Sequence, residues 1–193
     1  MHQEIHHHYI LHKPYRYLSQ FINNQNKRKN KKLLGELYDF ADGTMAIGRL
    51  DETSEGLLLL TTDGKVSAHI TSNKIEKEYY VQVDGSITKK AVKQLQDGVN
   101  ISIHSKPYTT KTCEVFAISS INDYAIEDRF VRDERHGLTS WISITLTEGK
   151  FRQVRKMTAA VGFPTLRLVR IRIGNIKLNL NVGDVLEVKK FDI

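Results

Sequence analysis

Two apolar runs separated by a short polar segment constrain this chain more than any other feature. The runs are Met45-Ala46-Ile47 and Leu57-Leu58-Leu59-Leu60, and residues 48–56 between them hold one arginine, three acidic residues and two hydroxyl residues. Apolar runs on both sides of a turn indicate that the turn is fixed at the edge of a core. Such a turn can present a charged group in a fixed geometry, and the alternative is an ordinary hairpin turn.

Composition indicates a folded protein with a polyanionic partner. The chain has 193 residues, of which 40% are hydrophobic and 26% are charged, so it can bury one core. This length predicts a single domain, or two closely joined subdomains with a shared core. The net charge is +7 and the isoelectric point is near 9.4. Nucleic acid is the commonest partner for such a charge, and simple solubility is the alternative.

Several function classes are excluded or disfavoured. The single cysteine, Cys113, rules out an internal disulfide and a cysteine-based zinc site, which fits a reducing cytoplasm. No apolar stretch is long enough to span a membrane, and the N-terminus does not read as a signal peptide. The histidines near it, His2, His6–His8 and His12, lack an accompanying carboxylate or cysteine cluster, so we expect no metal. No phosphate-binding glycine loop or dinucleotide fingerprint is present, so we expect no cofactor.

The periodicity of apolar residues predicts alternating strands and helices. Thr88 is expected to cap a helix that ends at Gly98, and Tyr79 and Tyr80 are expected on opposite faces of one strand. Other predicted elements are a strand at 9–11, a helical segment at 33–40, a helix at 66–70, a strand at 77–85, strands within 99–128, a strand at 141–146, a helix around 152–161 and strands from 166 to 188.

Four segments resemble one enzyme family. Residues 48–64 read G-R-L-D-x-x-S-E-G-L-L-L-L-T-x-D-G, which is similar to the catalytic motif of RsuA/RluB/RluE/RluF-type ribosomal RNA pseudouridine synthases. Residues 12–15 are similar to the family's lysine-proline turn, residues 77–79 to its K-x-Y motif, and residues 148–157 to E-G-x-x-R-Q-V-R-x-M. The resemblance covers nearly the whole chain and is weakest at 20–35 and 99–128.

This resemblance implies a fold and a reaction. The fold is α+β, a single pseudouridine synthase domain over residues 1–193, with a mixed, mainly antiparallel central sheet flanked by helices and a catalytic cleft across the middle. Asp51 is then the catalytic residue, Tyr79 stacks on the target base, and Arg155 sits beside Asp51. A guanidinium there suits the chemistry, because it favours the ionised carboxylate in a site that excludes water.

The same resemblance implies an RNA-binding surface. Arg49 would fill the space left by a flipped-out uridine. Further candidates for RNA contact are Lys13, Arg152, Lys156, the basic loop at 23–32, and Arg170 with Arg172 on a shared strand face. On a helix, Arg152, Arg155 and Lys156 would share the side opposite to Val154 and Met157.

The resemblance also suggests a substrate. A basic segment leading into Thr139-Ser140-Trp141, and a chain with no room for an S4 RNA-binding domain, favour the RluE branch, which modifies 23S ribosomal RNA. We therefore expect a cytoplasmic, monomeric enzyme with ribosomal RNA as its partner and no membrane attachment. The alternatives are the same reaction on another site, including 16S RNA, or a non-catalytic assembly factor. A glycoside hydrolase would need Glu52 or Glu55 as a second carboxylate.

Overall fold

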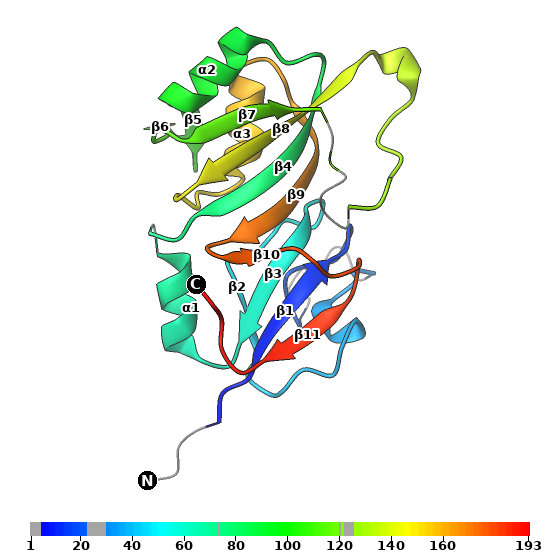
Figure 1. Cartoon of the computed structure of the whole chain (residues 1–193), viewed down its shortest axis with the longest axis vertical. Coiled ribbons are helices and arrows are strands. Elements are labelled where there is room, and N and C mark those ends of the chain that lie inside the picture. Colours follow the sequence, from blue (N-terminus) through cyan, green and yellow to red (C-terminus); the bar gives the residue numbers. More distant parts are fainter. Residues whose placement is uncertain (1–4, 23–29, 73, 120, 122–125) are drawn as a thin grey trace.

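One large sheet organises the protein. The structure is a computed structural model that describes residues 5–22, 30–72, 74–119, 121 and 126–193. Within them, a nine-stranded sheet has the order β11-β1-β3-β9-β4-β8-β7, with β2 paired to β3 and β10 paired to β9 (Figure 1). The elements are β1 (His8–Lys13), a 3-10 turn (Leu34–Glu36), β2 (Met45–Ile47), β3 (Glu55–Thr61), α1 (Gly64–Thr71), β4 (Lys77–Asp84), α2 (Lys89–Asp97), β5 (Asn100–Ile103), β6 (Lys106–Thr109), β7 (Glu114–Ile118), a second 3-10 turn (Glu134–His136), β8 (Thr139–Leu146), α3 (Gln153–Ala160), β9 (Thr165–Ile173), β10 (Ile176–Lys177) and β11 (Val185–Val188).

Strand β3 lies inside the sheet because it is apolar on both faces. All of its residues are buried, and four of them are the leucines of the apolar run. It pairs antiparallel with β1 and, over a short stretch, parallel with β9, where Gly56 lies opposite Arg170. Gly56 has φ +102°, and a Cβ there would lie 2.3 Å from the carbonyl oxygen of Arg170. Only glycine allows the two backbones to approach so closely.

The helices divide between the two faces of the sheet. Leu95 of α2 and Met157 of α3 join the strand residues Val81 and Ile142 in one buried cluster. Ile70 of α1 belongs to a second cluster, together with side chains of β3 and β9. Because side chains alternate along a strand, Tyr80 enters this second cluster while Val81 enters the first, so α1 lies on the opposite face from α2 and α3. The predicted α+β class with a mainly antiparallel sheet is confirmed.

The helices predicted at 66–70, from Thr88 to Gly98 and around 152–161 form as α1, α2 and α3, whereas the one predicted at 33–40 does not. The Asp63 carboxylate accepts hydrogen bonds from backbone N–H groups at the start of α1, and the Thr88 hydroxyl accepts one at the start of α2. The helical segment expected at 33–40 is wrong in length, because only the 3-10 turn Leu34–Glu36 forms. Its apolar side chains nevertheless pack together, with Leu34 fully buried.

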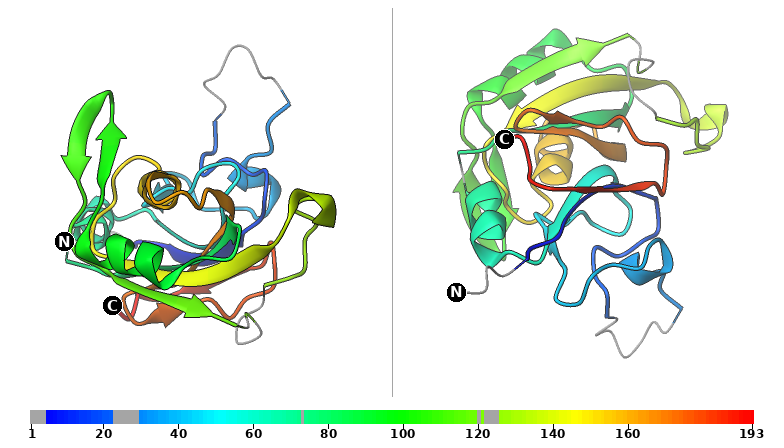
Figure 2. Two further views of the ribbon diagram at one scale, coloured as in Figure 1. Left: turned by 90° about the horizontal axis from the view of Figure 1, so that it is seen from above. Right: turned by 60° about the horizontal axis from the view of Figure 1, so that its bottom comes forward.

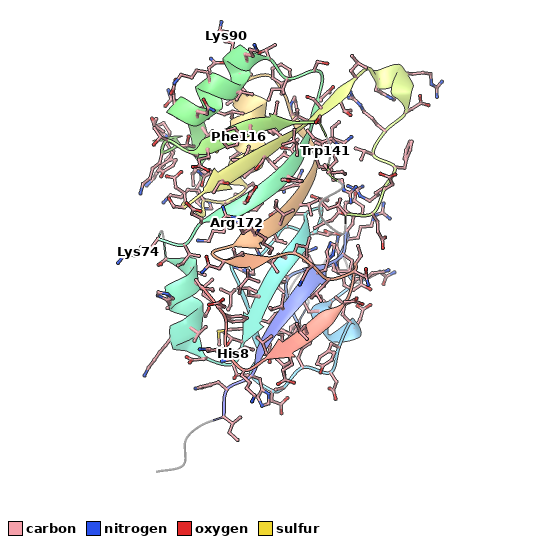
Figure 3. All side chains as sticks on the ribbon, in the orientation of Figure 1. His8, Lys74, Lys90, Phe116, Trp141 and Arg172 are labelled. Atoms are coloured by element: carbon pink, nitrogen blue, oxygen red, sulfur yellow. The ribbon has the colours of Figure 1, made fainter. Side chains whose placement is uncertain are left out.

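An irregularity in the pairing of β4 and β9 separates two arginines that were expected on one face. The register shifts between Glu78 and Tyr79, so Arg170 lies opposite Tyr79 while Arg172 lies opposite Glu78. Arg172 therefore forms ion pairs with Glu76 and Glu78 on the face seen in Figure 3. The prediction that Arg170 and Arg172 share an RNA-facing surface was wrong.

Hairpin β5–β6 stands out from the face of the sheet that carries α3 (Figure 2, left). Its tip consists of His104 and Ser105, which both adopt positive φ angles of +49° and +62°. Two such residues are typical of the tight turn that connects twisted antiparallel strands. In the described part of the chain, no helix combines the length and apolar character needed to cross a lipid bilayer.

Candidate active site

A tight turn between β2 and β3 carries Asp51. The preceding residue, Leu50, is buried, and its N–H and C=O groups both bond to the Ser19 hydroxyl, at 3.1 and 2.8 Å. The N–H of Ser54 donates to the carbonyl of Asp51 at 3.0 Å and closes the turn. The backbone is thus fixed on both sides of Asp51, which is the condition for placing a carboxylate accurately.

Two arginines approach Asp51, and they do so differently. Arg152 donates from Nη1 to Oδ2 of Asp51 at 2.8 Å, whereas Nε of Arg155 lies 3.7 Å from the same oxygen. Arg155 donates instead to the Thr53 carbonyl at 3.0 Å and to the Ser54 hydroxyl at 3.2 Å. Its side chain is 12% exposed, against 39% for Arg152. Arg152 therefore holds the carboxylate, and Arg155 mainly supports the turn beneath it.

Burial shapes the charge state around this pair. Desolvation lowers the pKa of Arg155, the neighbouring Arg152 guanidinium lowers it further, and Asp51 opposes both effects. Since an arginine pKa starts far above neutrality, the group stays charged. Asp51 thus has two positive partners close to one oxygen.

The close contact of Arg152 was not expected from the sequence. Arg152 precedes the first residue of α3 and adopts a left-handed conformation with φ +52°, so it does not continue the helix. The prediction that it shares a helical face with Arg155 and Lys156 was wrong for this reason. The left-handed backbone instead accompanies a side chain that reaches Asp51, on a segment 101 residues away in the sequence.

Asp51 opens onto a cleft of about 750 Å³, which also contains Tyr79. Tyr79 lies on β4 and packs against the core cluster of α2 and α3, while Tyr80 is buried on the other face of the strand. The expected separation of the two tyrosines is confirmed. Other residues lining the cleft are Arg49, Lys77, Phe151, Arg152 and Arg170. The cleft is bordered by the Asp51 turn, by β4 and by the loop before α3.

Basic residues outnumber acidic residues in the lining of the cleft, and Arg49, Lys150 and Arg152 are the exposed ones. Arg49 is exposed next to Asp51, as the flipping role requires. Arg170 is 3% exposed and donates to the carbonyls of Gly48 and Leu57 at 2.8 and 2.7 Å. Burial, reinforced by Arg170, lowers the pKa of Lys77 to about 8. The exposed basic groups suit a polyanion, whereas Arg170 and Lys77 are buried beneath them.

Lys13 does not lie on this surface. Its side chain is 0% exposed, and its Nζ donates to the carbonyl of Pro14 at 2.8 Å. Desolvation lowers its pKa to about 7, although Glu55, Glu52 and Asp51 act in the opposite direction. The prediction that Lys13 contacts RNA does not fit this burial, because an interior ammonium cannot reach a phosphate. Lys13 instead packs beneath the acidic turn.

The chain is similar to known proteins over most of its length. A family model described as RNA pseudouridylate synthase matches residues 7–160. The chain belongs to this family. It is 39% identical over 172 residues to ribosomal large subunit pseudouridine synthase E of Xanthomonas axonopodis pv. citri, covering 88% of this chain and 87% of the relative. The identity to the protein of the same name from Vibrio parahaemolyticus is also 39%, over 183 residues, covering 93% of this chain and 73% of that one.

Solved structures show the same fold. A crystal structure of a pseudouridylate synthase superposes with a TM-score of 0.74 at 24% identity, covering 97% of this chain and 72% of that chain. Human RNA pseudouridylate synthase domain containing 1 superposes with a TM-score of 0.56 at 12% identity, covering 96% of this chain and 80% of that chain. The pseudouridine synthase fold expected from the sequence is therefore confirmed.

Both glutamates near Asp51 form ion pairs with basic side chains in this pseudouridine synthase. Glu52 pairs with Lys31. Glu55 is held by Arg167 through two bonds of 3.0 Å, and Arg129 lies 3.3 Å from its Oε2. Neither stands opposite Asp51 as a free second carboxylate. The glycoside hydrolase alternative loses its only structural support.

Glu148 is a buried residue whose role the sequence did not reveal. It is 3% exposed and accepts hydrogen bonds from Tyr108 of β6 at 2.5 Å, from the side chain of Gln153, and from the backbone of Lys111 at 3.3 Å. The hydrogen bond that Tyr108 donates to Glu148 raises the pKa of Tyr108. Glu148 therefore fastens hairpin β5–β6 to the segment that carries Arg152. Glu148 lies in the E-G-x-x-R-Q segment that resembles the family motif, but no role was assigned to it from the sequence.

The remaining RNA-binding candidates have mixed positions. Of the basic loop at 23–32, residues 23–29 lie outside the described residues, and Lys31 is 11% exposed against Glu52. Lys156 donates from Nζ to the Ser102 carbonyl at 2.6 Å and keeps further donors.

Among the described residues, no group of three or more histidine, cysteine, aspartate or glutamate side chains could hold a metal ion.

Proposed function

We propose that this enzyme isomerises one uridine of 23S ribosomal RNA to pseudouridine. The observation that supports it best is the Asp51 carboxylate, held by Arg152 and Arg155 at the edge of a basic cleft that also contains Tyr79. The choice of large-subunit RNA rests on the names of the two relatives from Xanthomonas and Vibrio, which match most of both chains.

The reaction rearranges bonds without any redox change. The bond between C1′ of the ribose and N1 of uracil breaks, the base turns, and C1′ joins C5. The proton on C5 leaves and N1, freed from the sugar, takes up a proton, so substrate and product are isomers. The Asp51 carboxylate acts on the sugar or on the base, and its arginine partners hold it in place for either role.

The other cleft residues position the nucleotide in this proposal. Tyr79 stacks on the target base, since aromatic rings bind extruded bases by their faces. Arg49 occupies the space that the flipped uridine leaves in its helix. Arg152 and Lys156 contribute positive charge toward the RNA backbone at the mouth of the cleft.

Two further attributes belong to the same proposal. The enzyme acts as a monomer, because Asp51, Tyr79 and both arginines come from one chain and complete one cleft. It works in the cytoplasm, where ribosomal RNA is transcribed in bacteria. The nearest alternative is the same reaction on 16S RNA, because the cleft residues serve the chemistry and do not determine which uridine is modified. A non-catalytic assembly factor would have no need for the Asp51 ion pairs.

Tritium release from ribosomal RNA labelled at C5 of uridine tests the reaction. The native protein should release tritium from 23S RNA, and Asp51→Asn should release none although it binds the RNA normally. Mapping of the modified nucleotide then gives the site. Equal release by the variant would contradict the role of Asp51, and release from 16S RNA alone would replace the proposed substrate.

A further inference from the structure

Two aromatic rings lie exposed at the rim of the cleft. Phe151 lines the cleft with Asp51 and Tyr79, and it is 55% exposed. The ring of His104, at the tip of hairpin β5–β6, lies 5.7 Å from it with an angle of 22° between the planes. The two rings are therefore nearly parallel and both reach solvent. They form an aromatic surface that the reaction itself does not require.

The rings come from separate segments that are fastened together. Glu148, buried below them, bonds to Tyr108 of the hairpin and to Gln153 at the start of α3. Lys156 of α3 adds a second connection through the carbonyl of Ser102. These contacts fix the hairpin relative to the loop that carries Phe151. The ring pair is thus held in place before any ligand binds, which lowers the entropic cost of binding.

Positive charge surrounds the rings. Lys156 Nζ lies 5.1 Å from the centroid of Phe151, and Lys150 Nζ lies 5.1 Å from that of Tyr108. Lys106 is exposed on β6 beside the tip of the hairpin. Two exposed aromatic rings among cations fit a nucleobase with its phosphate, because bases stack on aromatic rings while lysines bind the backbone. An acidic peptide would use the lysines but would leave the rings without a partner.

The position of the rings limits which base they bind. Phe151 is adjacent to Arg152, which contacts Asp51, so a base on the ring pair belongs to a nucleotide close to the target uridine. A base within a duplex is already stacked on both faces and cannot lie on these rings. We propose that Phe151 and His104 form a stacking subsite for an unpaired nucleobase beside the target uridine. This inference rests on the proposed RNA substrate.

Steady-state kinetics on transcribed 23S RNA, measured as tritium release, test the subsite. Phe151→Leu keeps an apolar side chain but removes the ring, and kcat/KM should fall about fivefold to thirtyfold. Phe151→Tyr should stay within threefold of the native protein, since it keeps the stacking face. His104→Ala is a second variant and should also weaken kcat/KM. Phe116→Leu is the matched control, because Phe116 is 58% exposed but lies on β7, on the face of the sheet away from α2 (Figure 3).

Salt dependence separates stacking from charge. Phe151→Leu should leave the slope of log KM against log salt unchanged, whereas Lys150→Gln should reduce it by about one. If the native protein is active, a Phe151→Leu variant whose kcat/KM stays within twofold of the native value would overturn the subsite alone. A loss in kcat/KM no larger than that of Phe116→Leu would do the same. Equal losses in Phe151→Leu and Phe151→Tyr would also overturn it. No tritium release by the native protein would overturn the proposed function, and the subsite with it.

Discussion

Replacing Arg155 by methionine should reduce catalysis more than the same change at Arg152, although Arg152 is closer to Asp51. Arg155 donates to the Thr53 carbonyl and the Ser54 hydroxyl, so its loss releases the turn that carries the carboxylate. A hydrogen bond to a charged group contributes about 1.5–3 kcal/mol. Thr53 is exposed, and water can replace one of the two bonds. We therefore expect a loss of about 1.5–3 kcal/mol of transition-state stabilisation, or about 10-fold to 150-fold in kcat.

The matched variants sharpen this expectation. The ion pair of Arg152 with Asp51 is partly exposed, and such pairs contribute about 0.2–1 kcal/mol. Arg152→Met should therefore lower kcat about twofold to fivefold, with a rise in KM from its lost contact with RNA. Arg155→Lys should recover part of the loss, because an ammonium can bond to one of the two acceptors but not to both in the fixed geometry of a guanidinium.

Single-turnover tritium release with excess enzyme measures the chemical step, and titration of the enzyme measures binding separately. Circular dichroism of each variant checks that the sheet is retained. The reasoning would be refuted by an Arg155→Met variant within threefold of the native rate. A larger loss in Arg152→Met than in Arg155→Met would equally refute it, and would make Arg152 the residue on which Asp51 depends.

Three further predictions concern stability, each measured by urea denaturation. Glu55→Gln should cost about 3–5 kcal/mol because it leaves the buried Arg167 without its charge partner, and replacing both residues by methionine should cost less; a single loss below 1 kcal/mol would contradict this. Gly56→Ala should cost about 3 kcal/mol or more because its Cβ meets the Arg170 carbonyl at a positive φ, and a variant as stable as the native protein would show that the two backbones can separate. Burial lowers the pKa of Lys13 in the folded protein to about 7, so the unfolded chain binds more protons between pH 7 and 10.5 and native stability should rise with pH there. The stability advantage of Lys13→Met over the native protein should therefore shrink by about 2–3 kcal/mol from pH 7 to 9. A constant difference in stability would contradict the lowered pKa.

The sequence alone determined the elements whose cause is local. The apolar runs on both sides of residues 48–56 placed the Asp51 turn at the edge of a core, because apolar runs flanking a polar turn are buried. Thr88 marked the start of α2, because its side chain bonds to a backbone group only a few residues away. The alternation of side chains along β4 separated Tyr79 from Tyr80 for the same local reason. Asp51 was found by its motif and its rigid turn.

Only the tertiary structure decided which basic groups reach Asp51 and which are buried. The contact of Arg152 with Asp51 depends on a left-handed backbone at the start of α3 and on two segments that meet across the sheet. Burial of Lys13 depends on strands that pack around it from elsewhere in the chain. The irregularity between β4 and β9 turned Arg172 away from the cleft. Sequence periodicity describes one element at a time, whereas the direction and desolvation of a side chain depend on neighbours far away in the sequence.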